Sequence, residues 1–234
     1  MERHAAVILA GGHATRMGGV PKAGLRVGGH TLIDRVLRAL PDAQPRVAVG
    51  DVVHPGVIVT AEKPPRSGPA YATIAGLRHI PASVPFVAVL AVDLPFLTTD
   101  VINALVDAAD HAVDGAILID PRGRQQWLCG VWRHESLRRA GSRIAPGASM
   151  RDLLGGLTTT ALSWWDSDVP PWFDCDTPQA LSYARRLDQQ FRPRETPSQR
   201  HEPPTVDIQR DTGDVTRAVR SEEEDRIDDL GQPR

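Results

Sequence analysis

The sequence predicts an α/β fold, a three-layer sandwich in which helices cover a mostly parallel, Rossmann-like sheet. Short apolar runs alternate along the chain with stretches of helical periodicity, and this alternation is typical of parallel sheets with crossover helices. The run from Pro85 to Val92 is apolar throughout, as expected of a strand covered on both faces. Apolar residues make up 41% of the chain and aromatic residues only 5%. The core must therefore consist mainly of Ala, Val, Leu and Ile.

The first half of the chain predicts three strands and two helices. Ala5–Ala10 is an apolar strand that ends at a glycine-rich loop. We expect Thr31 to cap the first helix, whose apolar residues recur at helical spacing: Leu32, Ile33, Val36, Leu37 and Leu40. The next predicted elements are strands over Arg46–Val49 and Val57–Thr60 and a helix over Ala70–His79, which is entered through Gly68-Pro69.

The second half continues the alternation after the buried strand. Thr99 is expected to cap a helix that runs through Ala109, with Ile102, Leu105 and Val106 facing inward. Three more strands and a final helix complete the predicted body, in the order Gly115–Ile119, Trp127–Trp132, Thr158–Trp164 and Pro178–Leu187.

The composition changes at about residue 190. The segment 190–234 is rich in arginine, acidic residues and proline, and Phe191 is its one aromatic residue. Such a segment buries too little apolar area to offset its ordering entropy. We therefore predict one folded domain over residues 1–189 and a disordered, charged tail over 190–234. The tail is either an interaction arm or an extension without a function of its own.

Charge and hydropathy exclude several classes of protein. The formal net charge is −2, which gives no case for a nucleic-acid-binding body. No apolar run is long enough to span a bilayer, and Ala5–Ala10 is too short for a signal sequence. We interpret Cys129 and Cys175 as buried free thiols in a reducing compartment, with a disulfide or metal site as the alternative. The expected location is the cytoplasm.

Residues 9–18, LAGGHATRMG, form a loop between the first strand and the first helix, and Lys22 follows it. Glycines let backbone amides approach an oxygen-rich ligand, and Arg16 and Lys22 supply positive charge for phosphates. Lys22 is one of two lysines among 27 basic residues, which indicates a need for a compact point charge. The loop matches neither the Walker motif nor the dinucleotide fingerprint. The alternative is an ordinary strand-to-helix turn.

Acidic residues in two later segments are candidate metal ligands. Asp93 directly follows the buried strand, at the sheet edge where open α/β sheets bind ligands, and a carboxylate there suits Mg²⁺ beside a triphosphate. The other segment is Asp174-Cys175-Asp176, before Thr177-Pro178. The structural alternatives are a turn at Asp93 and a helix N-terminus capped by Asp176 or Thr177.

The first loop is similar to the nucleotidyltransferase signature Leu-Ala-Gly-Gly-x-x-x-Arg-Met-Gly-x-x-Lys, and it resembles more narrowly the molybdenum cofactor guanylyltransferase family. The pair Gly11-Gly12 favours this branch, because the related cytidylyltransferases have Leu-Ala-Ala-Gly there. The family commonly has Asp where this chain has Pro21, and often has a base-reading Asn where this chain has Gly50. The resemblance extends from about Ala5 to Leu187 and implies the fold of nucleotide-diphospho-sugar transferases.

The resemblance implies transfer of GMP from GTP to molybdopterin with release of pyrophosphate. Arg16, Lys22 and Asp93 would be catalytic. Asp93 would hold Mg²⁺, with Asp176 as second ligand and Asp174 as a weaker candidate. The implied nucleotide-binding residues are Leu9, Ala10, Gly11, Gly12, Arg16, Lys22, Gly50, Glu62, Gly68 and Asp93. Partners would be the two substrates and enzymes that deliver molybdopterin or accept the product, with no nucleic acid and no membrane.

Alternatives to guanylyl transfer stay open at this point. The same fold serves cytidylyl transfer to molybdopterin and nucleotidyl transfer to a sugar phosphate or phospholactate. A non-catalytic nucleotide-binding protein and a structural module that acts through its tail are further possibilities. The segment Ala61–Gly76 resembles the family's Asp…Gly-Pro-Leu-Ala-Gly stretch, with Glu62 where an aspartate is usual. It is either a lid over the nucleotide or pterin, or a plain connecting loop.

Overall fold

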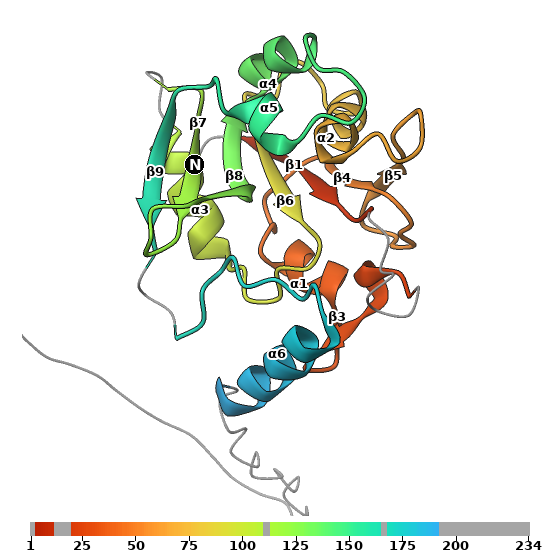
Figure 1. Cartoon of the computed structure of the whole chain (residues 1–234), viewed down its shortest axis with the longest axis vertical. Coiled ribbons are helices and arrows are strands. Elements are labelled where there is room, and N and C mark those ends of the chain that lie inside the picture. The colour runs from red at the N-terminus through yellow and green to blue at the C-terminus, as the bar shows by residue number, and fades with distance from the viewer. Residues whose placement is uncertain (1–2, 12–19, 110–112, 165–167, 192–234) are drawn as a thin grey trace, which may run out of the picture. The chain divides into compact units, whose positions relative to one another are not determined.

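A seven-stranded sheet lies at the centre of the molecule, with the strand order β5-β4-β1-β6-β8-β7-β9 (Figure 1). The computed structural model describes residues 3–11, 20–109, 113–164 and 168–191 of the 234. The strands of this sheet are β1 (His4–Leu9), β4 (Arg46–Val49), β5 (Ile58–Thr60), β6 (Phe86–Ala91), β7 (Gly115–Ile119), β8 (Gln125–Arg133) and β9 (Thr159–Ser163).

Most neighbouring strands run parallel. β1 pairs parallel with β4 on one side and with β6 on the other, and the pairs β4–β5 and β7–β9 are parallel too. β8 is antiparallel to both of its neighbours, β6 and β7. The chain passes from β1 to β4 on one side and later to β6 on the other, which creates the kind of switch point where such sheets bind ligands. The mostly parallel sheet is confirmed.

Helices cover both faces of the sheet, so the three-layer prediction is also confirmed (Figure 1). Side chains alternate along β1: Ala6 and Ile8 pack with α1 (Leu32–Arg38) and α3 (Thr99–Ala108). Ala5, Val7 and Leu9 pack on the opposite face. The helices of that second layer are α2 (Pro69–Leu77), α4 (His134–Gly141) and α5 (Met150–Leu154).

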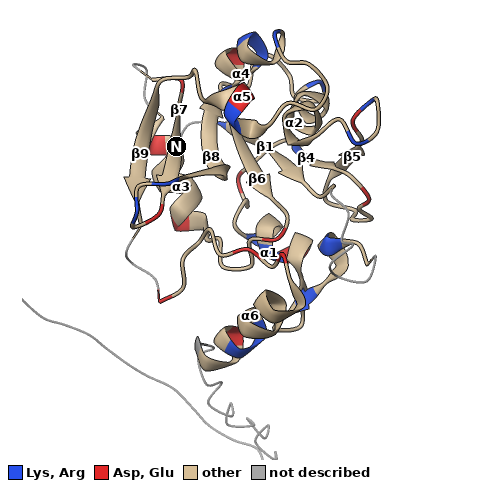
Figure 2. Ribbon diagram, in the orientation of Figure 1, with Lys and Arg blue, Asp and Glu red and all other residues tan. Residues whose placement is uncertain are grey.

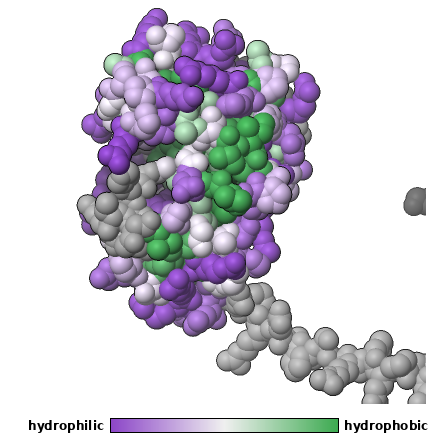
Figure 3. All heavy atoms as spheres, turned by 90° about the vertical axis from the view of Figure 1, so that its right-hand side faces the viewer, coloured by the Kyte–Doolittle hydropathy of each residue, from purple (hydrophilic) through white to green (hydrophobic). Residues whose placement is uncertain are grey.

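Charged residues lie mainly on the helices and loops, while β1 and β6 carry none of Lys, Arg, Asp or Glu (Figure 2). Figure 3 shows apolar residues on the face toward the edge strand β5, where Val53, Ile58 and Val59 are exposed. Among the described residues, no helix combines the length and apolar character needed to cross a membrane.

The helix caps confirm one prediction and correct another. Thr31 caps α1 through a capping box, in which its hydroxyl accepts from the Asp34 amide and the Asp34 carboxylate accepts from the Thr31 amide. The predicted cap at Thr99 is wrong, because Thr98 occupies that position with an extended backbone and accepts from the Val101 amide. Thr99 is the first helical residue, and its hydroxyl donates to the Arg38 carbonyl at 3.3 Å.

Several short elements escaped prediction. They are the 3-10 turn η2 (Lys22–Gly24), the hairpin of β2 (Arg26–Val27) and β3 (His30–Thr31), and the helices α4 and α5.

The last described helix, α6 (Pro178–Phe191), begins after Thr177, whose hydroxyl accepts from the Ala180 amide at 3.1 Å. Leu181 and Ala184 of this helix pack with Val27 and Leu32 in a third, smaller cluster. The helix extends two residues beyond the predicted domain boundary at residue 189. The tail beyond it lies outside the described residues, so the division into domain and tail stays a prediction.

Arg35 of α1 links α6 to the loop after Asp93. Its guanidinium donates to the Val27 carbonyl at 2.9 Å and to the Pro95 carbonyl at 3.0 Å, and it forms an ion pair with Asp188 of α6. The side chains of Arg35 and Asp188 are only 15% and 10% exposed. A pair this well buried is costly to break, because the remaining charge keeps its desolvation penalty without its partner.

We expect Arg35→Ala to lower the free energy of unfolding by about 3 kcal/mol, because it removes the buried ion pair with Asp188 and the hydrogen bonds to the Val27 and Pro95 carbonyls. Urea unfolding measures the loss. Arg38→Ala is the control, because Arg38 is an exposed residue of the same helix, and we expect a change within about 0.5 kcal/mol. Equal effects of the two substitutions would contradict the role given to Arg35.

Candidate active site

The carboxyl ends of β1, β4 and β6 are joined by backbone hydrogen bonds just beyond the strands. The Ala10 amide donates to the Val49 carbonyl at 2.8 Å, and the Val92 amide donates to the Leu9 carbonyl at 3.1 Å. Asp93 directly follows Val92 and is buried. The strands therefore place this carboxylate at the switch point of the sheet, as the sequence predicts.

Gly50 lies at this edge because no larger residue fits there. Its φ is +130°, and a Cβ on it would lie 2.4 Å from the Gly11 nitrogen and 2.7 Å from the Ala10 carbonyl carbon. The backbones after β1 and β4 thus touch where the related family often has a base-reading asparagine. Any base contact from this position must come from the backbone.

Lys22 joins two carboxylates that come from distant parts of the chain. Its ammonium donates to Asp93 Oδ2 at 2.7 Å and also forms an ion pair with Asp176 Oδ1. The turn η2 positions Lys22, whose side chain is 17% exposed, whereas that of Asp176 is 52% exposed. The cation therefore lies between a buried acid and an acid that faces solvent.

The segment 174–176 is attached to the same strand end by its backbone. The Cys175 amide donates to the Asp93 carbonyl at 3.1 Å, and the Cys175 side chain is buried. This bond places Asp174 and Asp176 on the two sides of a buried residue and next to Asp93. Both cysteines, Cys129 and Cys175, are free and buried.

Burial and charge shift the pKa values of this cluster. Burial raises the pKa of Asp93, against the opposing effect of the Lys22 charge. Burial, together with the charges of Asp176 and Asp93, also raises the pKa of Asp174. Burial alone would lower the pKa of Lys22, but its contacts with Asp93 and Asp176 outweigh that effect and raise it. Burial beside Asp93 and Asp174 raises the pKa of Cys175 to about 12, so this thiol stays neutral.

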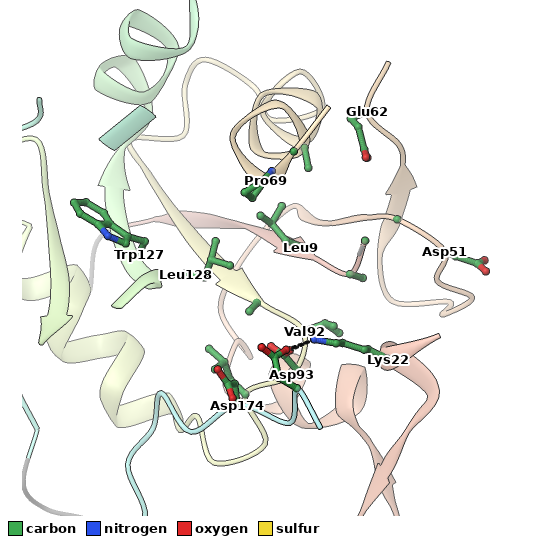
Figure 4. A pocket seen from close by; sticks show the side chains of 18 of the residues that line it. Leu9, Lys22, Asp51, Glu62, Pro69, Val92, Asp93, Trp127, Leu128 and Asp174 are labelled. Atoms are coloured by element: carbon green, nitrogen blue, oxygen red, sulfur yellow. Dashed lines mark hydrogen bonds and ion pairs between the residues drawn. The ribbon is translucent and has the colours of Figure 1, made fainter. Parts of the chain in front are cut away.

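A cavity of about 1280 Å³ opens above this cluster. Among the residues predicted to form the site, those that line the cavity are Leu9, Ala10, Gly11, Lys22, Gly50, Glu62, Gly68, Asp93, Asp174 and Asp176. In the view of Figure 4, Glu62 and Asp51 lie toward one side of the paired Lys22 and Asp93, and Trp127 lies toward the other. The predicted residues Gly12 and Arg16 lie outside the described residues.

The sequence did not single out the second wall of the cavity. It is formed by the first residues of β8, Gln125, Gln126, Trp127 and Leu128; Trp172 also lines the cavity. Because β8 runs antiparallel to β6, its first residues lie at the same sheet edge as the carboxyl end of β6, with Cys129 opposite Leu90. The sequence does contain the polar pair Gln125-Gln126 before an apolar strand. This pair indicates a cavity wall once the strand is known to run antiparallel to β6, because its first residues then lie at the ligand-binding edge of the sheet.

The donor set suits a hard divalent cation that also binds phosphate. Within the described part of the chain, no group of three or more His, Cys, Asp or Glu side chains is arranged to hold a metal. Mg²⁺ does not need such a group, because it usually takes one or two protein carboxylates and completes its shell with water and substrate phosphates. Asp93 and Asp176 already share one cation, the ammonium of Lys22, so these two acids fit that pattern.

Most of the chain matches a known protein family. Residues 6–163 match the family model described as the MobA-like NTP transferase domain. The chain belongs to the MobA-like NTP transferase family. It is therefore a nucleotidyltransferase, and enzymes of this family generally use a divalent metal.

Curated relatives cover most of the chain. A molybdenum cofactor guanylyltransferase of Nitrobacter hamburgensis is 28% identical over 196 residues, which span 77% of this chain and 92% of that protein. The protein of the same name from Rhodopseudomonas palustris is 31% identical over 198 residues, 78% of this chain and 91% of the relative.

Solved structures confirm the fold. The molybdopterin-guanine dinucleotide biosynthesis protein A of Archaeoglobus fulgidus superposes with a TM-score of 0.63 at 20% identity, covering 80% of this chain and 99% of that one. The 2-C-methyl-D-erythritol 4-phosphate cytidylyltransferase of Thermus thermophilus gives 0.60 at 22% identity, with 81% and 100% covered. This MobA-like chain thus shares the mostly parallel α/β fold of these two structures.

For this MobA-like chain we expect Gly50→Ala to lower the free energy of unfolding by at least about 2 kcal/mol, because the added Cβ meets backbone atoms that cannot turn away. Gly123→Ala is the matched control: Gly123 also has a positive φ, of +74°, but a Cβ there meets nothing within 4 Å. Its expected loss is about 1 kcal/mol, from the backbone conformation alone. Urea unfolding that gives equal losses would contradict the close approach at Gly50.

Proposed function

We propose that this protein transfers GMP from Mg²⁺-bound GTP to molybdopterin and releases pyrophosphate. The observation that carries the proposal is the ion cluster of Lys22, Asp93 and Asp176 at the switch point of the sheet, below a cavity large enough for two substrates. The curated relatives named molybdenum cofactor guanylyltransferase support this choice of substrates.

The reaction needs positioning and charge neutralisation from the protein. The terminal phosphate of the acceptor attacks the α-phosphorus of GTP, a new P–O bond forms, and the bond to the β-phosphate breaks as pyrophosphate leaves. An ionised phosphate is already a nucleophile, so no side chain has to remove a proton from it. Binding energy and fixed charge then lower the barrier.

Lys22 would supply the fixed positive charge next to the leaving pyrophosphate. Its pKa is raised by contacts with Asp93 and Asp176, so its ammonium stays charged at neutral pH. Asp93 and Asp176 would hold Mg²⁺, which neutralises phosphate charge when bound. Arg16 and Gly12 stay predictions as further phosphate-binding residues.

The two walls of the cavity suit the two substrates. The wall of Gly11, Gly50, Glu62 and Gly68 would take the nucleotide, because backbone amides and a carboxylate can bind its phosphates and base. The opposite wall holds Trp127 of β8, and flat heteroaromatic rings such as a pterin stack on indole. Lys22 and Asp93 lie where the two substrates would meet.

The cellular setting follows from the substrates and thiols. Molybdopterin would be delivered by, or its product passed to, other enzymes of cofactor assembly. Two buried free thiols, Cys129 and Cys175, support a reducing compartment, and we assign the protein to the cytoplasm.

We expect the full-length protein to release pyrophosphate from GTP only when molybdopterin and Mg²⁺ are present. Lys22→Ala should lower kcat/KM by about 100-fold or more, because it removes charge stabilisation at the leaving group. Lys63→Ala is the control, since Lys63 is exposed and does not line the cavity; its activity should equal that of the wild type.

A nucleotide panel in the same assay decides between the rival functions. Faster turnover with CTP than with GTP would replace guanylyl transfer by cytidylyl transfer. Turnover of GTP with a sugar phosphate or phospholactate but not with molybdopterin would change the acceptor. Tight binding of GTP without turnover of any acceptor would leave a non-catalytic nucleotide-binding protein.

A further inference from the structure

The loop between Glu62 and Gly68 brings a carboxylate and a guanidinium to the nucleotide wall of the cavity. Glu62 and Arg66 both line the cavity, and the Arg66 amide donates to Glu62 Oε1 at 3.1 Å. This bond ties the acidic side chain to the backbone that carries the basic one. The same short loop therefore presents the side chains of Glu62 and Arg66 to the cavity.

The backbone at Arg66 is unusual. Its φ is +66°, and among the described residues it is the one non-glycine residue with a positive φ. Arginine is rarely found there, because its Cβ crowds the following carbonyl group. Such strain at a cavity wall is a reason to look for a function of the side chain.

Hydrogen bonds and two prolines support this loop conformation. The Ser67 side chain is buried and donates to the Pro64 carbonyl, and the Ser67 carbonyl accepts from the Gly147 amide at 2.8 Å. Pro64 and Pro65 further restrict the backbone. Arg66 is exposed, and its guanidinium has no carboxylate partner among the residues that the structure describes. A cation on the cavity wall without a described carboxylate partner is available to a ligand.

We infer that Arg66 reads the base of the bound nucleotide by donating to O6 and N7 of guanine. Guanine presents these two acceptors side by side, and arginine is the side chain that most often binds them together. The neighbouring edge of guanine carries the N1–H and N2–H₂ donors, which a carboxylate such as Glu62 accepts. Cytosine has no equivalent of N7, so this pair of charges distinguishes the two bases. The inference rests on the proposed function, because it assumes a guanine nucleotide in this cavity.

The test compares GTP with 7-deaza-GTP, in which a C–H group replaces the N7 acceptor. Dissociation constants are measured by calorimetry on the full chain with Mg²⁺. Wild-type protein should bind 7-deaza-GTP about tenfold more weakly than GTP, because one charge-assisted hydrogen bond is lost. Arg66→Gly loses both charge-assisted bonds, so it should bind GTP about 100-fold more weakly than wild type does and should no longer distinguish the two nucleotides.

Both Arg66 variants should fold like the wild type, so that a change in affinity for GTP reports the loss of the guanidinium. Glycine adopts a positive φ freely, so Arg66→Gly should keep the wild-type melting temperature or exceed it. Arg66→Asn, which also tolerates this conformation, is a second variant without the cation and should give the same binding pattern. Lys63→Ala removes the other cation of the loop and should retain the wild-type preference for GTP.

The outcomes separate the inference from the function on which it rests. Wild-type protein that binds GTP and 7-deaza-GTP equally overturns the inference alone. So does an Arg66→Gly variant that keeps the tenfold preference. Wild-type protein that prefers CTP, or that binds no nucleotide, contradicts the proposed function, and the inference falls with it.

Discussion

The ammonium of Lys22 between Asp93 and Asp176 is the interaction on which the site depends. Asp93 is buried, and burial raises its pKa, so a cation beside it stabilises its ionised form together with the neighbouring Asp176 carboxylate. Lys22 supplies that cation from a turn far away in the sequence. The same charge that makes the cluster stable is the charge that nucleotidyl transfer needs at the leaving pyrophosphate.

The surrounding scaffold brings the parts of this cluster together. The Cys175 amide binds the Asp93 carbonyl, and Arg35 binds the Pro95 carbonyl together with α6. Gly50 lets the backbones after β1 and β4 touch. These contacts link the ends of three parallel strands to a late segment of the chain, so that residues 22, 93 and 176 meet. Precise placement of this kind is what catalysis without a protein nucleophile requires.

The central strands and Asp93 could be predicted because an apolar run followed by an acid has a simple physical meaning in a parallel sheet. The pairing of Lys22 with Asp176 could not, because it depends on contacts between segments more than 150 residues apart. The second wall of the cavity, formed by β8, was not predicted, because the sequence pattern does not reveal that β8 runs antiparallel to β6. No feature of the sequence predicts the positive φ of Arg66 either, because arginine rarely adopts that conformation.

The most direct test of this account is the affinity of the nucleotide-free protein for Mn²⁺, measured by electron paramagnetic resonance. If the Lys22 ammonium occupies the two carboxylates, it competes with a divalent cation for them. Lys22→Met, which keeps the length of the side chain without its charge, should then bind Mn²⁺ about tenfold more tightly than wild type, while Lys63→Met should not differ from it. An unchanged or weaker Mn²⁺ affinity in Lys22→Met would contradict the central role given to this ion cluster.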